Sequence, residues 1–306
     1  MKRIQYKKPA LTYHQQVEKL KARGLKINNE KKAIHLLEML SYYRLSGYWY
    51  PLLSDKVKEV FRVDSCFETA FNFYKFDREL RVLVSRELEK IEIAIRSMII
   101  YSFSHQFGPK WYFDELNFLN KQKLKETRRR IKKVFQKSDE EFVVSFRRRY
   151  SDSLPPSWIM LEVTSFGVLS SLFNNFRHGR DKRKIPESFG LSSKVFASWL
   201  HCLVYIRNLC AHHCRLWNRT FSISPITPKG TQKQWLINRP LKSNKTYFVL
   251  SMIIYLINII DPKNSFTKSV RELVKRYPEV KTNHMGFPEN WQDEPIWQNR
   301  TKEKNE

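Results

Sequence analysis

The residues best suited to chemistry lie in one short segment, Arg207 to His213, inside a long apolar-periodic stretch. Arg207 precedes His212 by five positions, and Asn208 and His213 adjoin the pair. An arginine can bind a phosphate and stabilise developing negative charge, and an imidazole can move a proton near neutral pH. Such a set can cleave RNA without a metal ion, because the ribose 2′-hydroxyl supplies the nucleophile. Arg207, Asn208, His212 and His213 are therefore the candidate catalytic residues.

The helix expected to carry these residues spans positions 192–217. Its apolar side chains recur with helical spacing, and Arg207 falls on their side, so its stem should be buried. Five positions correspond to about 140° around a helix, which aims Arg207 and His212 in different directions. Either the helix loosens near His212, or two copies of the chain meet at a twofold axis. A polar stripe is expected from Asn208, His212, Arg215 and Arg219.

Blander interpretations compete with this one. An Arg–His pair at this spacing arises by chance in a chain with 56 Lys and Arg and 8 His. His212 could simply be a hydrogen-bonded helix histidine. Cys202, Cys210, His212, His213 and Cys214 form a cluster of metal-ligand types, but one helix presents only two of them together, so no metal or other cofactor is expected. Motifs of hydrolase triads, nucleotide-binding loops and dinucleotide-binding folds are absent from the sequence.

The chain is strongly basic, with a net charge of +26, and a polyanion such as RNA is the expected partner. Residues 121–149 hold 12 Lys or Arg and predict a basic helix that contacts phosphates. A Pro-ended basic loop over residues 177–186 is a second candidate surface. The candidate RNA-binding residues are Arg128, Arg129, Arg130, Lys132, Lys133, Arg147, Arg148, Arg149, Arg180, Lys182, Arg183, Lys184, Arg215 and Arg219.

Periodicity predicts an all-α fold. Helical patterns cover residues 13–40, with a turn at Gly24, and residues 67–103, where Glu92 and Arg96 can pair. Only 8 glycines are present, and alternating strand patterns are lacking. We divide the chain into an N-terminal helical extension (1–60), a helical core (61–262), and a C-terminal helix with an irregular tail (263–306). Aromatic side chains in that tail could dock it onto the core.

The segment 41–51 packs five aromatic residues into eleven positions. The simpler interpretation is an aromatic core; the functional one is a platform on which bases stack beside Arg44. The longest apolar run, 247–260, is too short to span a membrane and contains polar residues. Residues 1–9 lack the apolar core of a signal peptide, and four cysteines argue against a disulfide framework. We therefore expect a reduced, cytoplasmic protein without a membrane partner.

Several segments resemble a known family. Arg207-Asn208-x3-His212, followed by His213, Arg215 and Leu216 to Arg219, resembles the signature of bacterial abortive-infection proteins of the AbiD/AbiF type, within the HEPN superfamily of helical ribonucleases. The similarity extends, in the family's order, to residues 8–12, 40–48, 89–96, 156–158, 162–169 and 285–291.

The resemblance implies a HEPN-like helical bundle and a composite site built by a homodimer. It also implies a toxin-like endoribonuclease that needs no metal and acts in antiphage defence, as well as a structured non-coding RNA as a partner. A non-catalytic RNA-binding scaffold is the alternative. A helix-turn-helix DNA-binding protein is a third possibility, but no short turn before a recognition helix supports it.

Overall fold

The computed structural model describes residue 5 and residues 8–238 and 242–298, and it confirms the predicted all-α fold. Part of the N-terminal stretch searched for a signal peptide lies outside these residues. The chain forms two compact units. Unit 1 contains the residues up to Glu79 together with Leu273–Lys281, and unit 2 contains Leu80–Glu272 and the residues from Thr282 onward. The three-part division made from the sequence stays a prediction.

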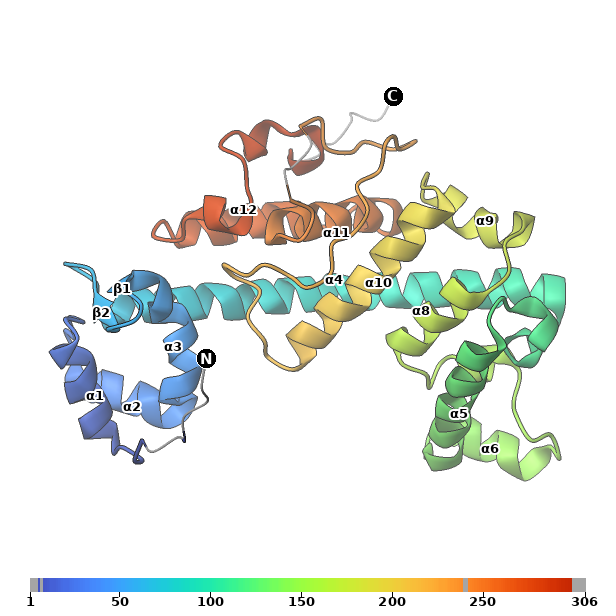
Figure 1. Ribbon diagram of the computed structural model, residues 1–306. Coiled ribbons are helices and arrows are strands. Elements are labelled where there is room, and N and C mark those ends of the chain that lie inside the picture. Colours follow the sequence, from blue (N-terminus) through green and yellow to red (C-terminus); the bar gives the residue numbers. More distant parts are fainter. Residues whose placement is uncertain (1–4, 6–7, 239–241, 299–306) are drawn as a thin grey trace. The chain divides into compact units, whose positions relative to one another are not determined.

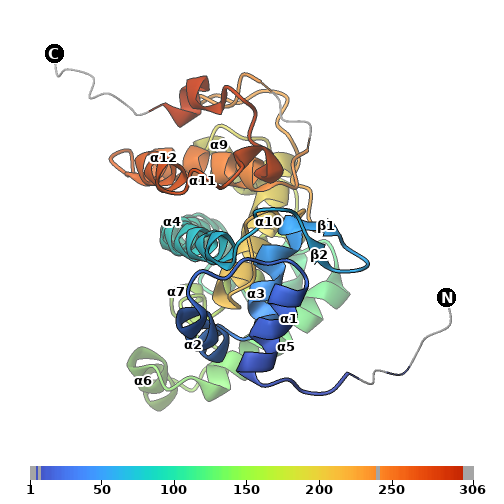
Figure 2. The ribbon, with the colours of Figure 1, turned by 90° about the vertical axis from the view of Figure 1, so that its left-hand side faces the viewer.

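Unit 1 is built from short helices and one small hairpin (Figure 1). Its elements are α1 (Tyr13–Ala22), α2 (Glu30–Leu40), α3 (Tyr42–Trp49), η1 (Tyr50–Leu52), β1 (Leu53–Asp55), β2 (Val60–Phe61) and the first part of α4 (Phe67–Phe107). Thr12 begins α1 with a capping box shared with Gln15. Gly24 follows α1 with a φ of 89°, a conformation that favours glycine, which confirms the turn predicted there. Figure 2 shows α1, α2 and α3 grouped within this unit.

Unit 2 contains the remainder of the 41-residue α4 and the helices that surround it. The following elements are η2 (Trp111–Phe113), η3 (Glu115–Asn117), α5 (Lys121–Lys137), α6 (Glu141–Arg149), α7 (Ser157–Met160), α8 (Phe166–Asn175), α9 (Arg180–Ser188), α10 (Ser193–Ala211), α11 (Thr246–Ile260), most of α12 (Phe266–Arg276), η4 (Thr282–Met285), η5 (Trp291–Asp293) and η6 (Pro295–Trp297). α8 packs against both α5 and α10 (Figure 1).

The core of unit 2 includes α11, which is buried from Thr246 to Ile257. The C-terminal tail docks beside it, as the sequence predicts. Trp297 is fully buried, and its indole Nε1 donates to Ser251 Oγ at 2.8 Å. Its ring stacks on that of Tyr247, with centroids 5.6 Å apart. The tail therefore belongs to the hydrophobic core although its helices are short.

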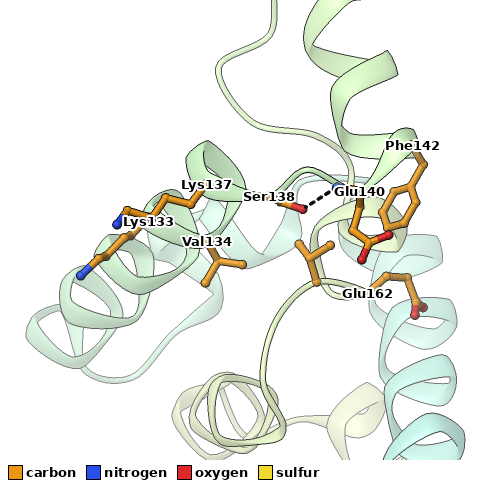
Figure 3. A pocket seen from close by; sticks show the side chains of 8 residues that line it. Lys133, Val134, Lys137, Ser138, Glu140, Phe142 and Glu162 are labelled. Atoms are coloured by element: carbon orange, nitrogen blue, oxygen red, sulfur yellow. Dashed lines mark hydrogen bonds between the residues drawn. The ribbon is translucent and has the colours of Figure 1, made fainter.

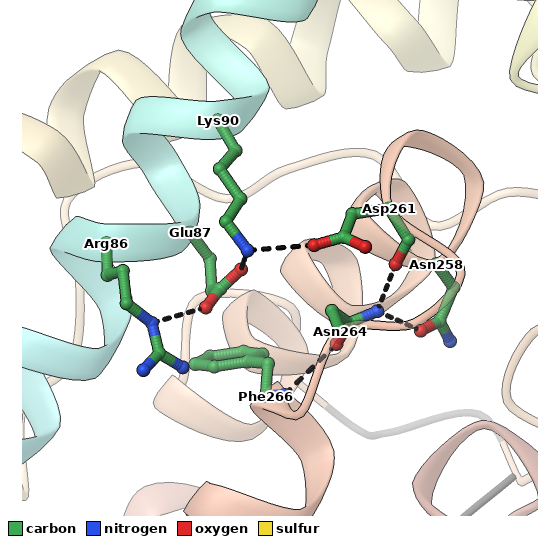
Figure 4. Close-up of polar contacts among 7 residues, drawn as sticks. All are labelled: Arg86, Glu87, Lys90, Asn258, Asp261, Asn264 and Phe266. Atoms are coloured by element: carbon green, nitrogen blue, oxygen red, sulfur yellow. Dashed lines mark hydrogen bonds and ion pairs between the residues drawn. The ribbon is translucent and has the colours of Figure 1, made fainter.

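A polar network ties α4 to the end of α11 (Figure 4). Glu87 is fully buried and accepts a bond from Arg86 Nε at 2.7 Å. Lys90 Nζ lies 3.3 Å from Glu87 and 2.9 Å from the carboxylate of Asp261, which follows α11. The Lys90 ammonium lowers the pKa of the Asp261 carboxyl group. The buried carboxylate thus has cationic partners, without which its burial would be costly.

Two basic segments differ in secondary structure from the sequence prediction. The segment expected as a loop over residues 177–186 contains α9, with Pro186 inside it. Proline usually ends a helix, but Ile185 and Pro186 are buried, and this packing holds the last turn together. The basic segment 121–149 is two helices, because the chain leaves helical geometry at Ser138, where φ is −75° and ψ is 129°.

Over residues 8–238 and 242–298, no single helix is both long and apolar enough to cross a membrane. α9 and α10 meet the criterion only when taken together, and they are bent by 66° relative to each other.

Candidate functional site

The candidate catalytic residues lie at the C-terminal end of α10. Ser192 begins this helix by accepting a bond from the Val195 amide. The helix ends at Ala211 in a Schellman motif, in which the Cys214 amide donates to Leu209 O at 2.8 Å and the His213 amide to Cys210 O at 3.0 Å. The expected helix over 192–217 therefore extends six residues too far at its C-terminal end.

His213 makes this ending possible. Its φ of 55° is left-handed, a conformation that is costly for residues with a Cβ atom and is usually taken by glycine at this position. His212 precedes it as the C-cap, with φ −89° and ψ 13°. The sequence left open whether the helix loosens near His212, and in the structure α10 ends directly before this residue. The polar stripe expected through Arg215 and Arg219 does not form on one helix, because both follow the break.

Arg207 lies on the surface of α10 with its side chain partly exposed. Its side chain keeps 44% of its accessible surface. The guanidinium Nε lies 3.8 Å from Oε2 of Glu92 on α4, whose side chain is only 13% exposed. Among the described residues, Glu92 is the partner that the structure gives Arg207. The arginine is therefore oriented by a carboxylate while its surface faces solvent.

Glu92 is itself held by a second arginine. Arg96 Nη2 lies 2.6 Å from Glu92 Oε1, which confirms the pair predicted from the sequence. Arg96 also donates to Thr164 O at 3.2 Å and lies 3.8 Å from Glu162. These contacts fix the carboxylate that orients Arg207. The sequence predicted the pair of Glu92 with Arg96, because the two are four positions apart on one helix. It did not predict the contact of Glu92 with Arg207, because that contact joins two helices far apart in the chain.

Asn208, His212 and His213 are exposed at the same helix end. Within the part of the chain that the structure describes, the side chains of Asn208 and His212 make no hydrogen bond or ion pair. The described residues thus supply no side-chain partner of the kind that the blander interpretation of His212 assumes. The site consequently offers an amide, an imidazole and an oriented guanidinium to a ligand from solvent.

The two arginines beyond the helix end lie partly buried. Arg219 Nη2 lies 3.5 Å from the Tyr205 hydroxyl, and its Nη1 lies 3.4 Å from Arg215 O. The Arg215 guanidinium is 6.0 Å from the centre of the Trp217 ring. Both side chains thus help to fold the segment after α10 back onto the protein, and this structural role occupies part of their bonding capacity.

The cluster of cysteines and histidines does not converge. Cys202 and Cys210 are buried, and His212 and His213 are exposed. Burial raises the pKa of the Cys202 thiol to about 12, which disfavours the thiolate that binds metals. Over the described ranges, no three His, Cys, Asp or Glu side chains are grouped so that they could hold a metal ion.

Most of the predicted basic surface is exposed, but Arg128 is partly buried, and Arg147, although exposed, donates to backbone carbonyls. Arg128 is 18% exposed, pairs with Glu115 at 3.0 Å, donates to Phe113 O, and lies 4.3 Å from the centre of the Phe113 ring. Arg147 donates to the carbonyls of Phe135, Gln136 and Ser138 at 3.1, 2.9 and 2.7 Å. The first anchors α5, and the second caps its C-terminus.

The remaining side chains of this surface are exposed. They are Arg129, Arg130, Lys132 and Lys133 on α5 and Arg148 and Arg149 on α6. A shallow cavity of about 750 Å³ adjoins them, lined by Lys133, Lys137, Glu140 and Glu162 among others. Figure 3 shows the two lysines extending away from the two carboxylates. The cavity therefore mixes both signs of charge and does not suit a phosphate.

The basic residues of α9 also divide into exposed side chains and one buried side chain. Arg180, Arg183 and Lys184 are exposed. Lys182 is only 4% exposed, and its ammonium donates to Phe176 O at 2.7 Å, at the end of α8. Burial lowers the pKa of Lys182 to about 8. Lys182 thus caps a helix and cannot reach RNA, which corrects its place among the predicted contacts.

The aromatic segment 41–51 divides between core and surface. Trp49 is buried, and Tyr48 is buried with its hydroxyl 2.6 Å from Asp77. Tyr43 is 89% exposed. It lines a cavity of about 440 Å³ within unit 1 that also includes Tyr50 and Lys19. The core interpretation holds for Tyr48 and Trp49, and Tyr43 remains open to a stacking partner.

Comparison with known proteins places the chain in a family. The family model described as Abi-like protein matches residues 35–218, which is more than half of the 306 residues. The chain therefore belongs to the Abi-like protein family, and this suggests a role in abortive-infection defence. No curated protein and no solved structure matches the chain. The family confirms the resemblance to abortive-infection proteins; the AbiD/AbiF type and the HEPN superfamily stay predictions.

Proposed function

We propose that this protein is a metal-independent endoribonuclease of the HEPN type, acting as a toxin-like effector in abortive infection. The observation that carries the proposal is the solvent-facing group of Asn208, His212 and an oriented Arg207 at one helix end. An imidazole and a guanidinium beside one phosphodiester supply proton transfer and charge stabilisation, the two needs of RNA transesterification. Membership of the Abi-like family supports the biological role.

The proposed reaction is an attack of a ribose 2′ oxygen on the adjacent phosphorus. His212 removes the proton of a ribose 2′-hydroxyl, and the 2′ oxygen forms a bond to the adjacent phosphorus. The bond from phosphorus to the 5′ oxygen of the next nucleotide breaks, and that oxygen receives a proton, for which His213 is the candidate donor. Arg207 binds the phosphate and stabilises its charge in the transition state, and Asn208 orients it. The products are a 2′,3′-cyclic phosphate and a 5′-hydroxyl.

A homodimer completes this site in our proposal. Arg207 lies on α10 and His212 is the C-cap residue where this helix ends, and in our proposal the two groups at one phosphate come from two chains. A twofold axis near the ends of two α10 helices would bring the arginine of one subunit to the histidine of the other. A structured non-coding RNA is the further partner implied by the family resemblance, and the exposed cations of α5 and α6 are the surface for it.

The proposal is tested by incubating the protein with RNA in EDTA and identifying the ends produced. We expect fragments with 2′,3′-cyclic phosphate from the wild-type protein and none from His212→Ala. Retained cleavage by that variant would remove His212 from the catalytic role.

A non-catalytic RNA-binding scaffold is the second candidate. The exposed cations Arg129, Lys132 and Lys133 favour it, because they lie on α5 and not on α10. Tight, salt-sensitive RNA binding without any cleavage would support this alternative.

A further inference from the structure

A polar cavity of about 600 Å³ lies in unit 2 between α5, α8 and α10. Its volume falls in the range of small-ligand sites. Residues from all three helices line it, and most of them are polar. The charged and titratable ones are Lys123, Glu126 and Arg130 on α5 and His201 on α10. None of the catalytic residues lines this cavity.

The walls of the cavity are held by interactions between α5 and α8. Asn175 Oδ1 accepts from the Asn120 amide, and Asn175 Nδ2 donates to Asn120 O, both at 2.9 Å. The hydroxyls of Thr127 and Ser171 lie 3.3 Å apart. Within α8, Asn174 Nδ2 donates to Ser170 O at 2.9 Å. These bonds fix the cavity before any ligand binds, which lowers the entropy cost of binding.

Three groups that suit a nucleotide remain available. In the described part of the chain, the side chains of Lys123, Arg130 and His201 make no hydrogen bond or ion pair. Lys123 and Arg130 are seven positions apart, so they share one face of α5. Glu126 lies between them on that face and can accept a bond from a ribose hydroxyl or a base amino group, while it disfavours a site filled only with phosphates.

The cavity lies on the path to the candidate catalytic residues. His201 and Asn208 are seven positions apart on α10, so they lie within about 20° of one another around the helix and about 10 Å apart along it. A strand that leaves the cavity along this face therefore reaches Asn208 and then His212 at the helix end.

We propose that this cavity binds one nucleotide of a single-stranded RNA, a few nucleotides from the bond that is cut. The phosphate lies against Lys123 and Arg130, and the ribose and base face Asn174, His201 and Glu126. This inference rests on the proposed function for the course of the strand toward His212. A lone strand is required, because the base of a duplex is already paired and stacked.

The test measures binding of a labelled single-stranded RNA of about 12 nucleotides, in a His212→Ala background that cannot cleave. The pocket variant is Lys123→Glu with Arg130→Glu. Its control is Lys121→Glu with Lys125→Glu, which changes the net charge equally on exposed positions of the same helix outside the cavity. We expect the pocket variant to weaken binding by about tenfold or more and the control by about twofold. Equal weakening by both would overturn the inference.

A second measurement needs no substitution in the cavity. RNA containing 4-thiouridine is cross-linked to the protein by light, and the attached peptides are identified. We expect attachment within residues 119–130, 167–175 or 201–204. Attachment elsewhere only, or equal affinity for a duplex of the same sequence, would contradict a single-strand site.

The two proposals fail separately. If the wild-type protein does not cleave RNA but the pocket variant alone loses affinity, the nucleotide site stands and the ribonuclease proposal falls. If the wild-type protein cleaves and the pocket variant binds like its control, the ribonuclease proposal stands and the nucleotide site falls.

Discussion

Nε of Arg207 lies 3.8 Å from Oε2 of Glu92, a residue 115 positions earlier on α4. The same carboxylate is 2.6 Å from Arg96, so two arginines share one acidic group. Glu92 therefore acts as a positioning residue for the guanidinium that we propose binds the phosphate.

Substituting Glu92→Gln keeps the shape of the side chain and removes its charge. We expect kcat for RNA cleavage to fall about tenfold with a smaller change in KM, since the guanidinium loses its orientation in the transition state. Glu92→Asp should recover part of the rate. A loss of thermal stability that accounts for the whole rate change, with no recovery by aspartate, would assign Glu92 a structural role only.

A site shared by two subunits predicts complementation. Arg207→Ala and His212→Ala should each be inactive alone. After equal amounts of the two variants are unfolded and refolded together, half of the dimers contain one subunit of each. In such a mixed dimer, one of the two sites combines an intact Arg207 with an intact His212. We therefore expect about a quarter of wild-type activity. No recovery, with mixed dimers shown to form, would place both residues of a site in one subunit.

Arg147 should be needed for stability and not for RNA contact. Arg147→Ala removes three bonds to carbonyls at the end of α5, and we expect it to lower the free energy of unfolding by about 1–2 kcal/mol. Arg148→Ala, at an exposed neighbouring position, should change stability by less than about 0.5 kcal/mol. Chemical denaturation of both variants makes the comparison, and equal effects would refute the capping role.

Lys182 predicts a pH dependence of stability. Burial lowers its folded-state pKa from 10.5 to about 8, so between these values the unfolded chain binds more protons than the folded one. The stability of the wild-type protein relative to Lys182→Met should therefore rise from pH 8 to pH 10.5. Chemical denaturation of both proteins across this range gives the difference between their free energies of unfolding. The contributions of other titrating groups cancel in this difference. A difference that does not change with pH would contradict the buried position of the ammonium.

The helices of this chain were predictable because their apolar spacing is regular. Periodicity placed α1, α2 and α4 within a few residues of their ends. The end of α10 was not predictable, because His213 takes a left-handed conformation that sequence patterns associate with glycine. α9 was missed because Pro186 lies inside it.

The site was predictable by residue type and not by surroundings. Arg207, Asn208 and His212 stood out in the sequence, but the exposure of Arg207 and its contact with Glu92 depend on the packing of α10 on α4. Composition likewise could not separate Arg129, which faces solvent, from Lys182, which caps a helix. Lys123 had one weak signal, its seven-residue spacing from Arg130 on α5, and this spacing does not extend to His201 on α10.

In the proposed reaction, a ribose 2′-hydroxyl attacks the phosphate beside Arg207 and His212. The most direct test uses two RNA oligonucleotides in EDTA, identical except for one 2′-deoxy nucleotide at the mapped cleavage position. We predict cleavage of the unmodified strand, with a 2′,3′-cyclic phosphate end, and none at the deoxy position. Cleavage at the deoxy position, or loss of all cleavage on adding EDTA, would contradict the account.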